Sequence, residues 1–466
     1  MDLLKKSLIS IIIILFSSSL FGAGFHVNVE QGMKAMSLGG AFVGLADDPT
    51  AIYYNPAGLT QLKKKVYISG SYVFGLFHPT LHNPRIYDKY GILRLSQDTK
   101  SQDTRWAQIP SFYVTYKISD RFTFGLGFFA PFGTATDWTH TWIGRYFADK
   151  TDLRTYDINP TLAIKLNDKF SIGLGINYVY SHVEIKKSFS YPFLAFNPLV
   201  QKKLGFSLTP AQQLSLYNRL YNRNYDVDIK LHGDTGSGGK GWAFNIGLMF
   251  KPNENWQFGL IYRSEIDLHF DGKADYNYMP GIKTLGKEVG IPQLSAYPLF
   301  QRTDISASLT LPDYLAFGVV NKSLKNWTFL MDIYWTNWSK YDKLEVKYDT
   351  FPYKTSVPKD WDDVIAIRLG AEYKVNENLA FRVGYMHDES PVPDKTRGPE
   401  LACSDRNDFT FGVGLKIGKL KLDGAYLLAL FKEKHSNLVD EQTGTVLKGK
   451  YNTIAHVIGL TFTYEF

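Results

Sequence analysis

Apolar and polar residues alternate with a period of two along most of this chain, and the pattern is clearest at the C-terminus. There, every second position carries a side chain that is mostly large and apolar, namely Ile454, His456, Ile458, Leu460, Phe462, Tyr464 and Phe466. Small or polar residues fill most positions between Thr453 and Glu465. Because successive side chains of a strand point to opposite faces, the pattern predicts a strand with lipid on one side and a polar or packed interior on the other.

The same alternation predicts fourteen strands in all. They cover residues 65–77, 106–118, 121–131, 152–166, 169–187, 225–250, 255–275, 303–321, 325–348, 361–375, 378–388, 406–417, 419–432 and 449–466. Short turns such as "KISDRF" and "KPNENW" alternate with long polar connections, as periplasmic turns alternate with extracellular loops. We therefore predict an all-β fold, a 14-stranded antiparallel transmembrane β-barrel. A soluble β-sandwich would not have strands of this length with aromatic ends.

One long connection, near residues 190–223, contains a segment with helical spacing. Thr209 begins a capping box, and apolar residues recur three and four positions apart after it. The sequence therefore predicts a helix over residues 207–223 within an extracellular loop.

Aromatic residues are frequent in two of the predicted loops. The stretch before the helix, "SYPFLAFNPLV", contains Phe193 and Phe196, and the stretch "DWTHTWIGRYF" contains Trp138 and Trp142. Each stretch has two interpretations that the sequence leaves open. The aromatic side chains either pack on their own loop or form a landing patch for an apolar ligand.

Residues 1–22 have the features of a secretory signal peptide. Two lysines precede an apolar run from Leu8 to Phe16, and small residues follow as far as Gly22. The apolar run is too short to span a bilayer comfortably, which disfavours a retained helical anchor. We expect cleavage after Gly22, with Ser19 as the alternative, and export of the mature chain.

The composition suits an exported barrel. Aromatic residues make up 15% of the chain, glycine occurs 39 times, and Cys403 is the single cysteine, so no disulfide can form within the chain. The formal charge of +7 is mild for 466 residues. No clustered basic face indicates nucleic-acid binding.

The segment before the first strand, residues 23–62, is compact and rich in glycine and alanine. A fourteen-stranded barrel is too wide for its own lining side chains to close it. Small residues allow close backbone packing, and Asn55-Pro56 predicts a rigid turn whose side chain bonds backbone that no strand satisfies. We therefore predict that this segment is a plug inside the barrel, and we refer to it as the hatch.

The sequence resembles the FadL family of outer-membrane long-chain fatty-acid transporters, a family that also includes importers of aromatic hydrocarbons. The resemblance covers nearly all of the mature chain. It is carried by Ala23-Gly24-Phe25, Asn55-Pro56-Ala57, "GLGFFAPFGTATDW", "WAFNIGLMFKPNENWQFGLIYRSEI", "LTLPDYLAFG" and "DESPVPDKTR". The C-terminal Phe466 also resembles the signal that the barrel assembly machinery reads.

The resemblance implies passive uptake of long-chain fatty acids or similar hydrophobic compounds by a monomer in the outer membrane. Ligand would be caught by apolar loops, held in the lumen beside the hatch, and released into membrane lipid through a break in the third strand. Pro131-Phe132-Gly133 fits this lateral gate, because proline lacks an N–H and glycine permits a bend. An ordinary strand end is the alternative. An importer of neutral aromatic or alkyl hydrocarbons is the alternative function.

The chain departs from the family pattern where a ligand carboxylate would bind. Ser404 and Asp405 stand in place of a Pro-Asp pair, and Asp408 stands where an arginine is usual before the twelfth strand. The basic ligand residue that the resemblance implies on the fifth strand is His182.

Three arginines, Arg263, Arg368 and Arg382, should point into the lumen by strand alternation. Either all three join a salt-bridge network that holds barrel and hatch together, or one lacks a partner and meets a ligand carboxylate. We expect Arg368 to be that residue, because Glu372 on the same strand face lies roughly 13 Å away.

Enzymatic readings find no support in the motifs. "GDTGSGGKG" lacks the Ser or Thr of a phosphate loop and precedes a strand. Neither a Gly-x-Ser-x-Gly elbow nor a paired-His metal motif is present, so we predict no catalytic residues, no metal and no cofactor. A lipase barrel and an open polar porin are the remaining alternatives, and the hatch argues against the porin.

Overall fold

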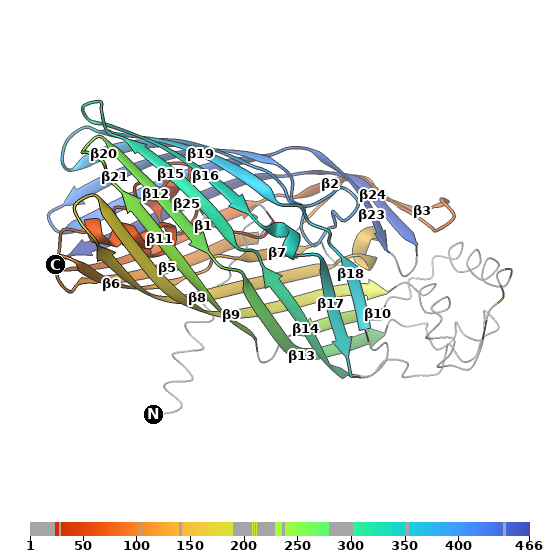
Figure 1. Cartoon of the computed structure of the whole chain (residues 1–466). Helices are drawn as coiled ribbons and strands as arrows, with labels where there is room; N and C mark the ends of the chain where they lie inside the picture. The colour runs from red at the N-terminus through yellow and green to blue at the C-terminus, as the bar shows by residue number, and fades with distance from the viewer. Residues whose placement is uncertain are drawn as a thin grey trace.

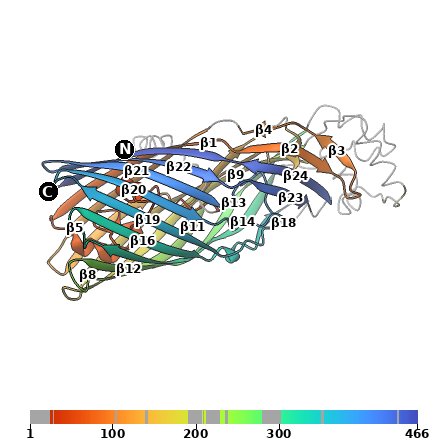
Figure 2. The same cartoon turned by 90° about the horizontal axis from the view of Figure 1, so that it is seen from above.

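The computed structural model describes residues 24–27, 29–102, 105–138, 142–189, 229–234, 238–278, 302–349, 354–440 and 444–466, with the single residues 207, 209 and 211. The predicted signal peptide, Ala23, Phe193, Phe196 and almost all of the predicted helix lie outside these residues. The described chain forms a long barrel of tilted strands (Figure 1). The same barrel seen from above narrows little along its length (Figure 2).

The barrel wall has fourteen antiparallel positions, which confirms the predicted fold class. We call each position a stave; it is formed by one strand or by two successive strands with a break between them. Eight staves are single strands: β1 (Val66–Phe77), β5 (Arg105–Lys117), β8 (Lys150–Lys165), β9 (Phe170–Phe189), β20 (Leu379–Asp388), β21 (Arg406–Ile417), β22 (Leu420–Phe431) and β25 (Ile454–Glu465). The barrel closes because β1 pairs with β25 on one side and with β5 on the other.

The other six staves are each divided into two strands. They are β6 (Phe122–Phe129) with β7 (Gly133–Asp137), β10 (Ile229–Asp234) with β11 (Gly239–Phe250), β12 (Trp256–Arg263) with β13 (Ile266–Tyr278), β14 (Thr303–Leu311) with β15 (Tyr314–Asn321), β16 (Trp327–Thr336) with β17 (Lys343–Tyr348), and β18 (Lys354–Pro358) with β19 (Val364–Lys374). The short helix η4 (Trp338–Lys340) lies between β16 and β17. Most breaks therefore fall toward the end with the long loops.

Burial follows the predicted alternation. Along β25 the exposed and buried residues alternate without interruption, and Leu460 and Phe462 are each more than half exposed on the outer face. An outer band of large apolar side chains is what a lipid-facing wall requires. No helix in the described part of the chain is long and apolar enough to cross a membrane.

A second, five-stranded sheet extends beyond the barrel at the end opposite the C-terminus (Figure 1). It consists of β2 (Thr80–Tyr87), β3 (Leu93–Ser96), β4 (Lys100–Ser101), β23 (Lys434–Asp440) and β24 (Thr445–Asn452). The predicted strand 449–466 is therefore wrong at its start, because residues 449–452 belong to β24. We refer to these five strands as the outer sheet.

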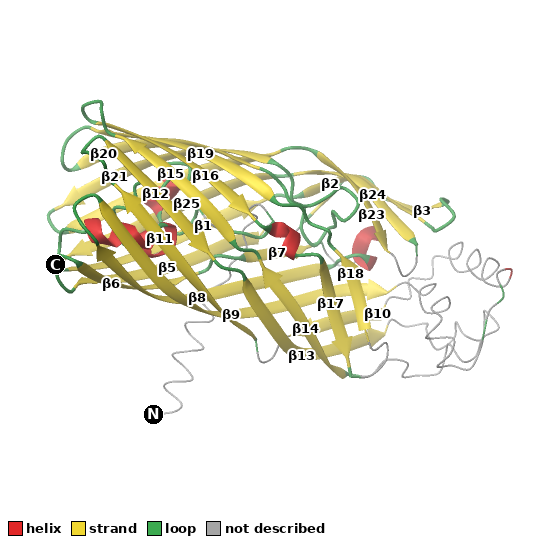
Figure 3. Ribbon diagram, viewed as in Figure 1, coloured by secondary structure: helices red, strands yellow, loops and turns green. Residues whose placement is uncertain are grey.

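The hatch lies inside the end of the barrel that carries the C-terminus, where Figure 3 shows its helices in red. It contains α2 (Met33–Ser37), α3 (Ala51–Tyr54) and the 3-10 helix η1 (Pro56–Gln61). Its apolar residues, from Ala35 to Leu62, form a buried cluster with wall residues such as Tyr113 and Met249. The short turns lie at this end, so we take it as the periplasmic end.

Asn55 makes the turn that joins α3 to η1. Its side-chain amide donates to the carbonyls of Val43 and Leu248 at 3.0 Å each, and its oxygen accepts from Ala57 N at 3.2 Å. Leu248 belongs to the wall, so a single fully buried side chain ties two parts of the hatch to the barrel. Pro56 begins η1, where a missing N–H costs no hydrogen bond.

Candidate functional site

The barrel wall is interrupted between β5 and β7. The ladder between β5 and β6 begins at Phe112 opposite Phe128, and β6 ends at Phe129. Beyond that point β7 pairs with β8, from Gly133 opposite Arg154 onward, and in the described residues it forms no ladder with β5. Pro131 and Pro110 lie on opposite sides of this gap, and neither has a backbone N–H to bridge it. In the described residues, the segment from Ala130 to Asp137 therefore has no backbone ladder to β5.

The start of the hatch occupies the inner side of the gap. Val27 N donates to Pro131 O at 2.7 Å, and Gly133 N donates to Phe25 O at 2.9 Å. His26 forms an isolated antiparallel bridge with Phe132, and their rings stack at 4.7 Å. The strand segment that lacks a partner in the wall therefore pairs with the hatch inside the lumen. Backbone hydrogen bonds join the hatch to the gap.

An aromatic group holds the hatch start from the opposite wall. The ring of Phe25 packs edge-on against Trp338 and Tyr341, with centroids 4.9 and 5.7 Å away, and lies 5.4 Å from Trp361. A Cβ at Gly24 would come within 2.5 Å of Trp338, so a glycine is needed there. The described start of the hatch, from Gly24 to Val27, is therefore held on two sides, by this aromatic group and by the gap.

The lumen on the outer side of the hatch is filled by apolar side chains that pack together. Its buried cluster includes hatch residues, gap residues and inward-facing residues of many staves, such as Val29, Phe132, Ile266, Leu311, Met386 and Leu427. Such a lining disfavours a polar solute and suits a hydrophobic one. This cluster lies directly behind the gap, because Ala130 and Phe132 belong to both.

Arg368 is buried within the lumen and incompletely bonded. Its Nη1 donates to Gly40 O at 3.3 Å, and its guanidinium lies 3.7 Å from the ring centroid of Tyr334. Its Nε and Nη2 have no hydrogen-bond partner in the described residues. Glu372 does not neutralise it, because Glu372 bonds Arg382. Burial, followed by the charges of Arg368 and Arg263, lowers the pKa of His26 well below its ordinary value, so His26 is neutral.

The other two predicted arginines serve the hatch. Arg382 bonds Glu372 at 2.7 Å and Asp423 at 2.6 Å, and Glu372 lies 4.0 Å from Lys34 of the hatch. Arg263 donates to Asn177 at 3.0 Å and to the carbonyl of Tyr53 in the hatch at 3.3 Å. These contacts join barrel and hatch. Among the three arginines, Arg368 has two donors without a partner in the described residues, Nε and Nη2, and Arg263 has one, Nε.

His182 does not lie with these arginines. The alternation of β9 buries residues 177, 179 and 181, so His182 shares the outward face of Tyr180 and stands opposite Arg154. An outward side chain cannot meet a ligand in the lumen, and the ligand role that the resemblance implied for His182 is therefore not supported by its position.

Trp138 and Trp142 are fully buried under the outer sheet. Their rings stack at 4.9 Å, and they pack with Leu81, Leu447 and Tyr451. The indole nitrogen of Trp138 donates to Pro399 O at 2.7 Å. Of the two open interpretations of this loop, the structure has the one in which the aromatic residues pack within the protein.

A buried charged group that sequence reasoning missed lies on β20 and β21. Arg406 contacts Asp388 at 3.2 Å and Asp408 at 3.5 Å, and burial raises the pKa of nearby Glu30 in the hatch. Position 408 is thus an acid, and the basic residue of this strand is Arg406, two positions earlier, with acids on both sides. The signal in the sequence was the triplet Arg406-Asn407-Asp408, because strand alternation turns the first and third of these side chains inward.

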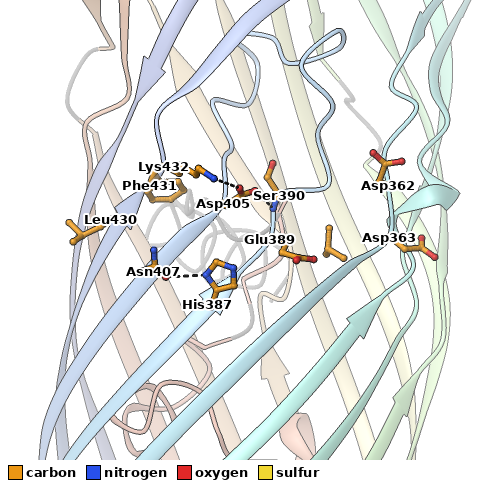
Figure 4. A pocket seen from close by; sticks show the side chains of 11 residues that line it. Asp362, Asp363, His387, Glu389, Ser390, Asp405, Asn407, Leu430, Phe431 and Lys432 are labelled. Atoms are coloured by element: carbon orange, nitrogen blue, oxygen red, sulfur yellow. Dashed lines mark hydrogen bonds and ion pairs between the residues drawn. The ribbon is translucent and has the colours of Figure 1, made fainter.

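A surface groove of about 650 Å³ lies on the outer side of β19 to β22 (Figure 4). His387 bonds Asn407 at 3.0 Å, Asp405 accepts from Ser390 N at 3.1 Å, and Ser390 Oγ faces Cys403 at 3.4 Å. The side chains of Ser390 and His387 therefore contact Cys403 and Asn407 and not each other. The polar lining of this groove does not suit a hydrophobic ligand.

Fold and site together define an outer-membrane transport barrel, filled by an internal hatch and interrupted at one stave. A family model described as "Outer membrane protein transport protein (OMPP1/FadL/TodX)" matches residues 13–466, and the chain belongs to this family. The "Long-chain fatty acid transport protein" of Escherichia coli O6:H1 is 27% identical over 87% of this chain and 86% of its own length. "Outer membrane protein P1" of Haemophilus influenzae is 23% identical over 99% of each chain.

Solved structures show the same fold. A FadL homologue of Pseudomonas aeruginosa has a TM-score of 0.79 and 24% identity, covering 95% of this chain and all of its own. The toluene transporter TodX of Pseudomonas putida has a TM-score of 0.67 and 16% identity, covering 94% and 99%. The predicted family and the outer-membrane location are thereby confirmed.

Proposed function

We propose that this protein takes up long-chain fatty acids or similar hydrophobic compounds, without catalysis, and releases them sideways into the outer membrane. The observation that carries the proposal is the gap between β5 and β7 with an apolar lumen directly behind it. A solute leaving there passes from one apolar surface to another and avoids water. The names of the curated relatives support the substrate class.

Release requires the hatch start to leave the gap. Val27 and Phe25 contribute two backbone hydrogen bonds to the broken stave, each worth about 0.5–1.5 kcal/mol net. Ligand that fills the apolar lumen competes with Phe25 and Phe132 for the same contacts. The hatch start therefore serves as the movable inner wall of the gate formed by Pro131, Phe132 and Gly133.

Arg368 is the expected contact for a ligand carboxylate. Two of its donors have no acceptor in the described residues, and a guanidinium matches a carboxylate in geometry. Import of neutral hydrocarbons is the second candidate function. It is favoured by the lumenal acids Asp388 and Asp408 around Arg406, and by the outward position of His182.

The proposal includes the setting of the barrel. We expect a monomer surrounded by outer-membrane lipid and inserted by the barrel assembly machinery through the C-terminal strand. Phe466 is more than half exposed on the lipid face, where such a signal can be read.

The decisive experiment measures uptake of labelled palmitate and of labelled hexadecane by cells that carry or lack this protein. Faster palmitate uptake supports the fatty-acid proposal, and faster hexadecane uptake alone supports the second candidate. Mass spectrometry of compounds extracted from the purified protein identifies the natural class. Equal uptake with and without the protein contradicts both, and release of free fatty acid from an ester would indicate a lipase.

A further inference from the structure

The periplasmic ends of the barrel strands share a side chain that ligand transport does not explain. Seven strands run toward this end, and each places one residue at the same position. The backbone N–H of that residue donates to the carbonyl of the residue immediately before the neighbouring strand, at 2.8–2.9 Å. In six strands the residue is a lysine: Lys117, Lys165, Lys251, Lys322, Lys374 and Lys416. We call these six residues the lysine rim. The seventh is Glu465.

The lysine rim faces the barrel axis. Lys117 continues the buried positions of Tyr113 and Thr115 on β5, and Lys374 continues that of Glu372 on β19. The residues that follow, such as Ile118 and Ile417, are apolar and exposed on the outer face. The ammonium groups therefore do not belong to the lipid-facing surface, where headgroup phosphates would explain them. Neighbouring members are two strands apart, roughly 10 Å.

The acids near the lysine rim neutralise it only in part. Lys374 lies 3.7 Å from Glu372 and Lys416 lies 3.3 Å from Glu465, but these two acids also pair with Arg382 and Lys421. Lys117 and Lys165 pair with Asp120 and Asp168, which are 99% and 97% exposed, and such surface pairs are weak. The turns that follow the lysine rim contain the acids Asp120, Asp168, Glu254 and Glu377. They also contain the basic residues Arg121, Lys169, Lys325 and Lys419, which offset the charge of these acids.

Two members of the lysine rim have no carboxylate partner among the described residues. Lys251 bonds the amide oxygen of Gln61 at 2.5 Å, and Lys322 has no acid within 4.0 Å. Burial and then the charge of Lys322 lower the pKa of Lys251 to about 8. Burial likewise lowers the pKa of Lys322. Burial is the leading cause of both shifts, and the charge of Asp47 partly opposes it. A carboxylate bound at these lysines would favour their charged forms.

The described part of the hatch, at the centre of this face, lacks the apolar anchors of a stable protein interface. In the described part of the hatch, no large apolar side chain is exposed, and Lys63, Lys64 and Lys65 follow it. Protein interfaces concentrate their energy in buried aromatic or apolar residues, which the hatch does not offer; the exposed apolar side chains at this end, such as Leu324, lie in the turns between strands. Lysines on flexible stems instead suit diffuse contact with a polymer of repeated negative charges.

We propose that the lysine rim is a docking surface for the carboxylate-bearing peptidoglycan that underlies the outer membrane. The contact holds the barrel against the cell wall through repeated ammonium–carboxylate pairs. It depends on the orientation of the barrel and not on the identity of the transported ligand. A failure of this proposal therefore leaves the transport proposal intact.

The test measures co-sedimentation of the purified, detergent-solubilised protein with purified peptidoglycan sacculi. At about 0.01 M salt, where charges act over about 30 Å, we expect binding that is lost near 1 M salt. Replacing all six members of the lysine rim by glutamine should reduce binding about tenfold. The matched control replaces six lysines outside the periplasmic rim by glutamine, namely Lys343, Lys347, Lys354, Lys432, Lys448 and Lys450, and should bind as the native protein does.

Equal binding by the two variants, or salt-independent binding, would overturn the proposal. Binding to poly-L-glutamate but not to sacculi would also overturn it and would point to an acidic protein. A shift of the unheated band in electrophoresis shows that each variant is folded. Should the sixfold variant fail to fold, Lys251→Gln with Lys322→Gln provides the same comparison, since neither lysine has a carboxylate partner in the described structure.

Discussion

The two halves of the lumen differ in what their walls present to the interior. In the periplasmic half the wall offers glycines, and the hatch backbone approaches them directly: a Cβ at Gly384 would lie 2.0 Å from Gly39 N, and one at Gly259 would lie 2.2 Å from Val43 O. In the outer half the wall offers large apolar side chains and a gap. One half therefore seals by contact between backbones, and the other provides a surface and an exit.

The comparison assigns different consequences to mutations in each half. A change on the periplasmic side should open the barrel to ions, since a wide barrel without its plug leaves an aqueous channel. A change on the outer side should alter uptake while the seal holds.

Gly384→Val should prevent the hatch from seating. The added Cβ would meet Gly39 N and Leu38 C, which are backbone atoms that cannot rotate away, and overpacking of this kind costs about 1–3 kcal/mol or more. We expect ion conductance in planar bilayers to rise about tenfold as the lumen opens. Gly70→Val is the matched control, because the nearest atom there is 3.9 Å away. Equal conductance of the two variants would show that the hatch does not seal at this contact.

Pro131→Thr combined with Gly133→Val should close the exit without disturbing the seal. Both changes favour a regular strand, which allows β7 to pair toward β5. Uptake should fall about tenfold, the loss expected when a step costs roughly 1.4 kcal/mol more, while purified protein still binds ligand. Pro160→Thr is the control, because Pro160 stands opposite Leu126 in an unbroken ladder. Normal uptake through a strand shown to be continuous would exclude this gate.

Asn55→Ala should loosen the seal and leave the barrel folded. The change removes hydrogen bonds to Val43, Leu248 and Ala57 and leaves buried groups unsatisfied, at a cost of about 1–3 kcal/mol. We expect a smaller rise in conductance than for Gly384→Val, with unchanged heat-modifiable mobility. Asn321→Ala, which loses two hydrogen bonds to exposed Ser323, is the control. A conductance equal to that of the native protein would make Asn55 dispensable for the seal.

These elements differ in how far the sequence predicts them. Strand positions depend on an alternation that is visible within ten residues, so the fourteen staves were predictable. Pro131 and Gly133 locally indicate only the end of a strand, and the interpretation as a break in the wall came from the family resemblance. Burial of Trp138 and Trp142 was not, because it requires β2 to pair with β24, more than 350 residues later in the chain. No local pattern carries that information.

The charged residues show the same limit. Alternation places Arg263, Arg368 and Arg382 inside the barrel, but their partners come from neighbouring staves and from the hatch. Glu372 meets Arg382 because the two stand opposite each other across β19 and β20. His182 shows how a resemblance misleads when strand parity is not checked, since one residue of shift exchanges the lumen for the outer face.

The smallest expected effect, and the sharpest test of the outer half, is a loss of ligand discrimination in Arg368→Ala. If Arg368 meets a ligand carboxylate, the variant should bind palmitate about 1.5 kcal/mol more weakly and hexadecane with unchanged affinity. This is the low end of the range for hydrogen bonds to charged groups, because Gly40 O and Tyr334 already satisfy part of the guanidinium in the absence of ligand. Arg382→Ala is the control: its partners are Glu372 and Asp423, so it should affect both ligands equally by loosening the hatch.

Calorimetric titration of both ligands into each variant measures the difference. Equal weakening for both ligands in Arg368→Ala would assign Arg368 to the support of the hatch through Gly40. Unchanged binding of both would leave an apolar lumen that selects by shape alone, which is the behaviour expected of an importer of neutral hydrocarbons.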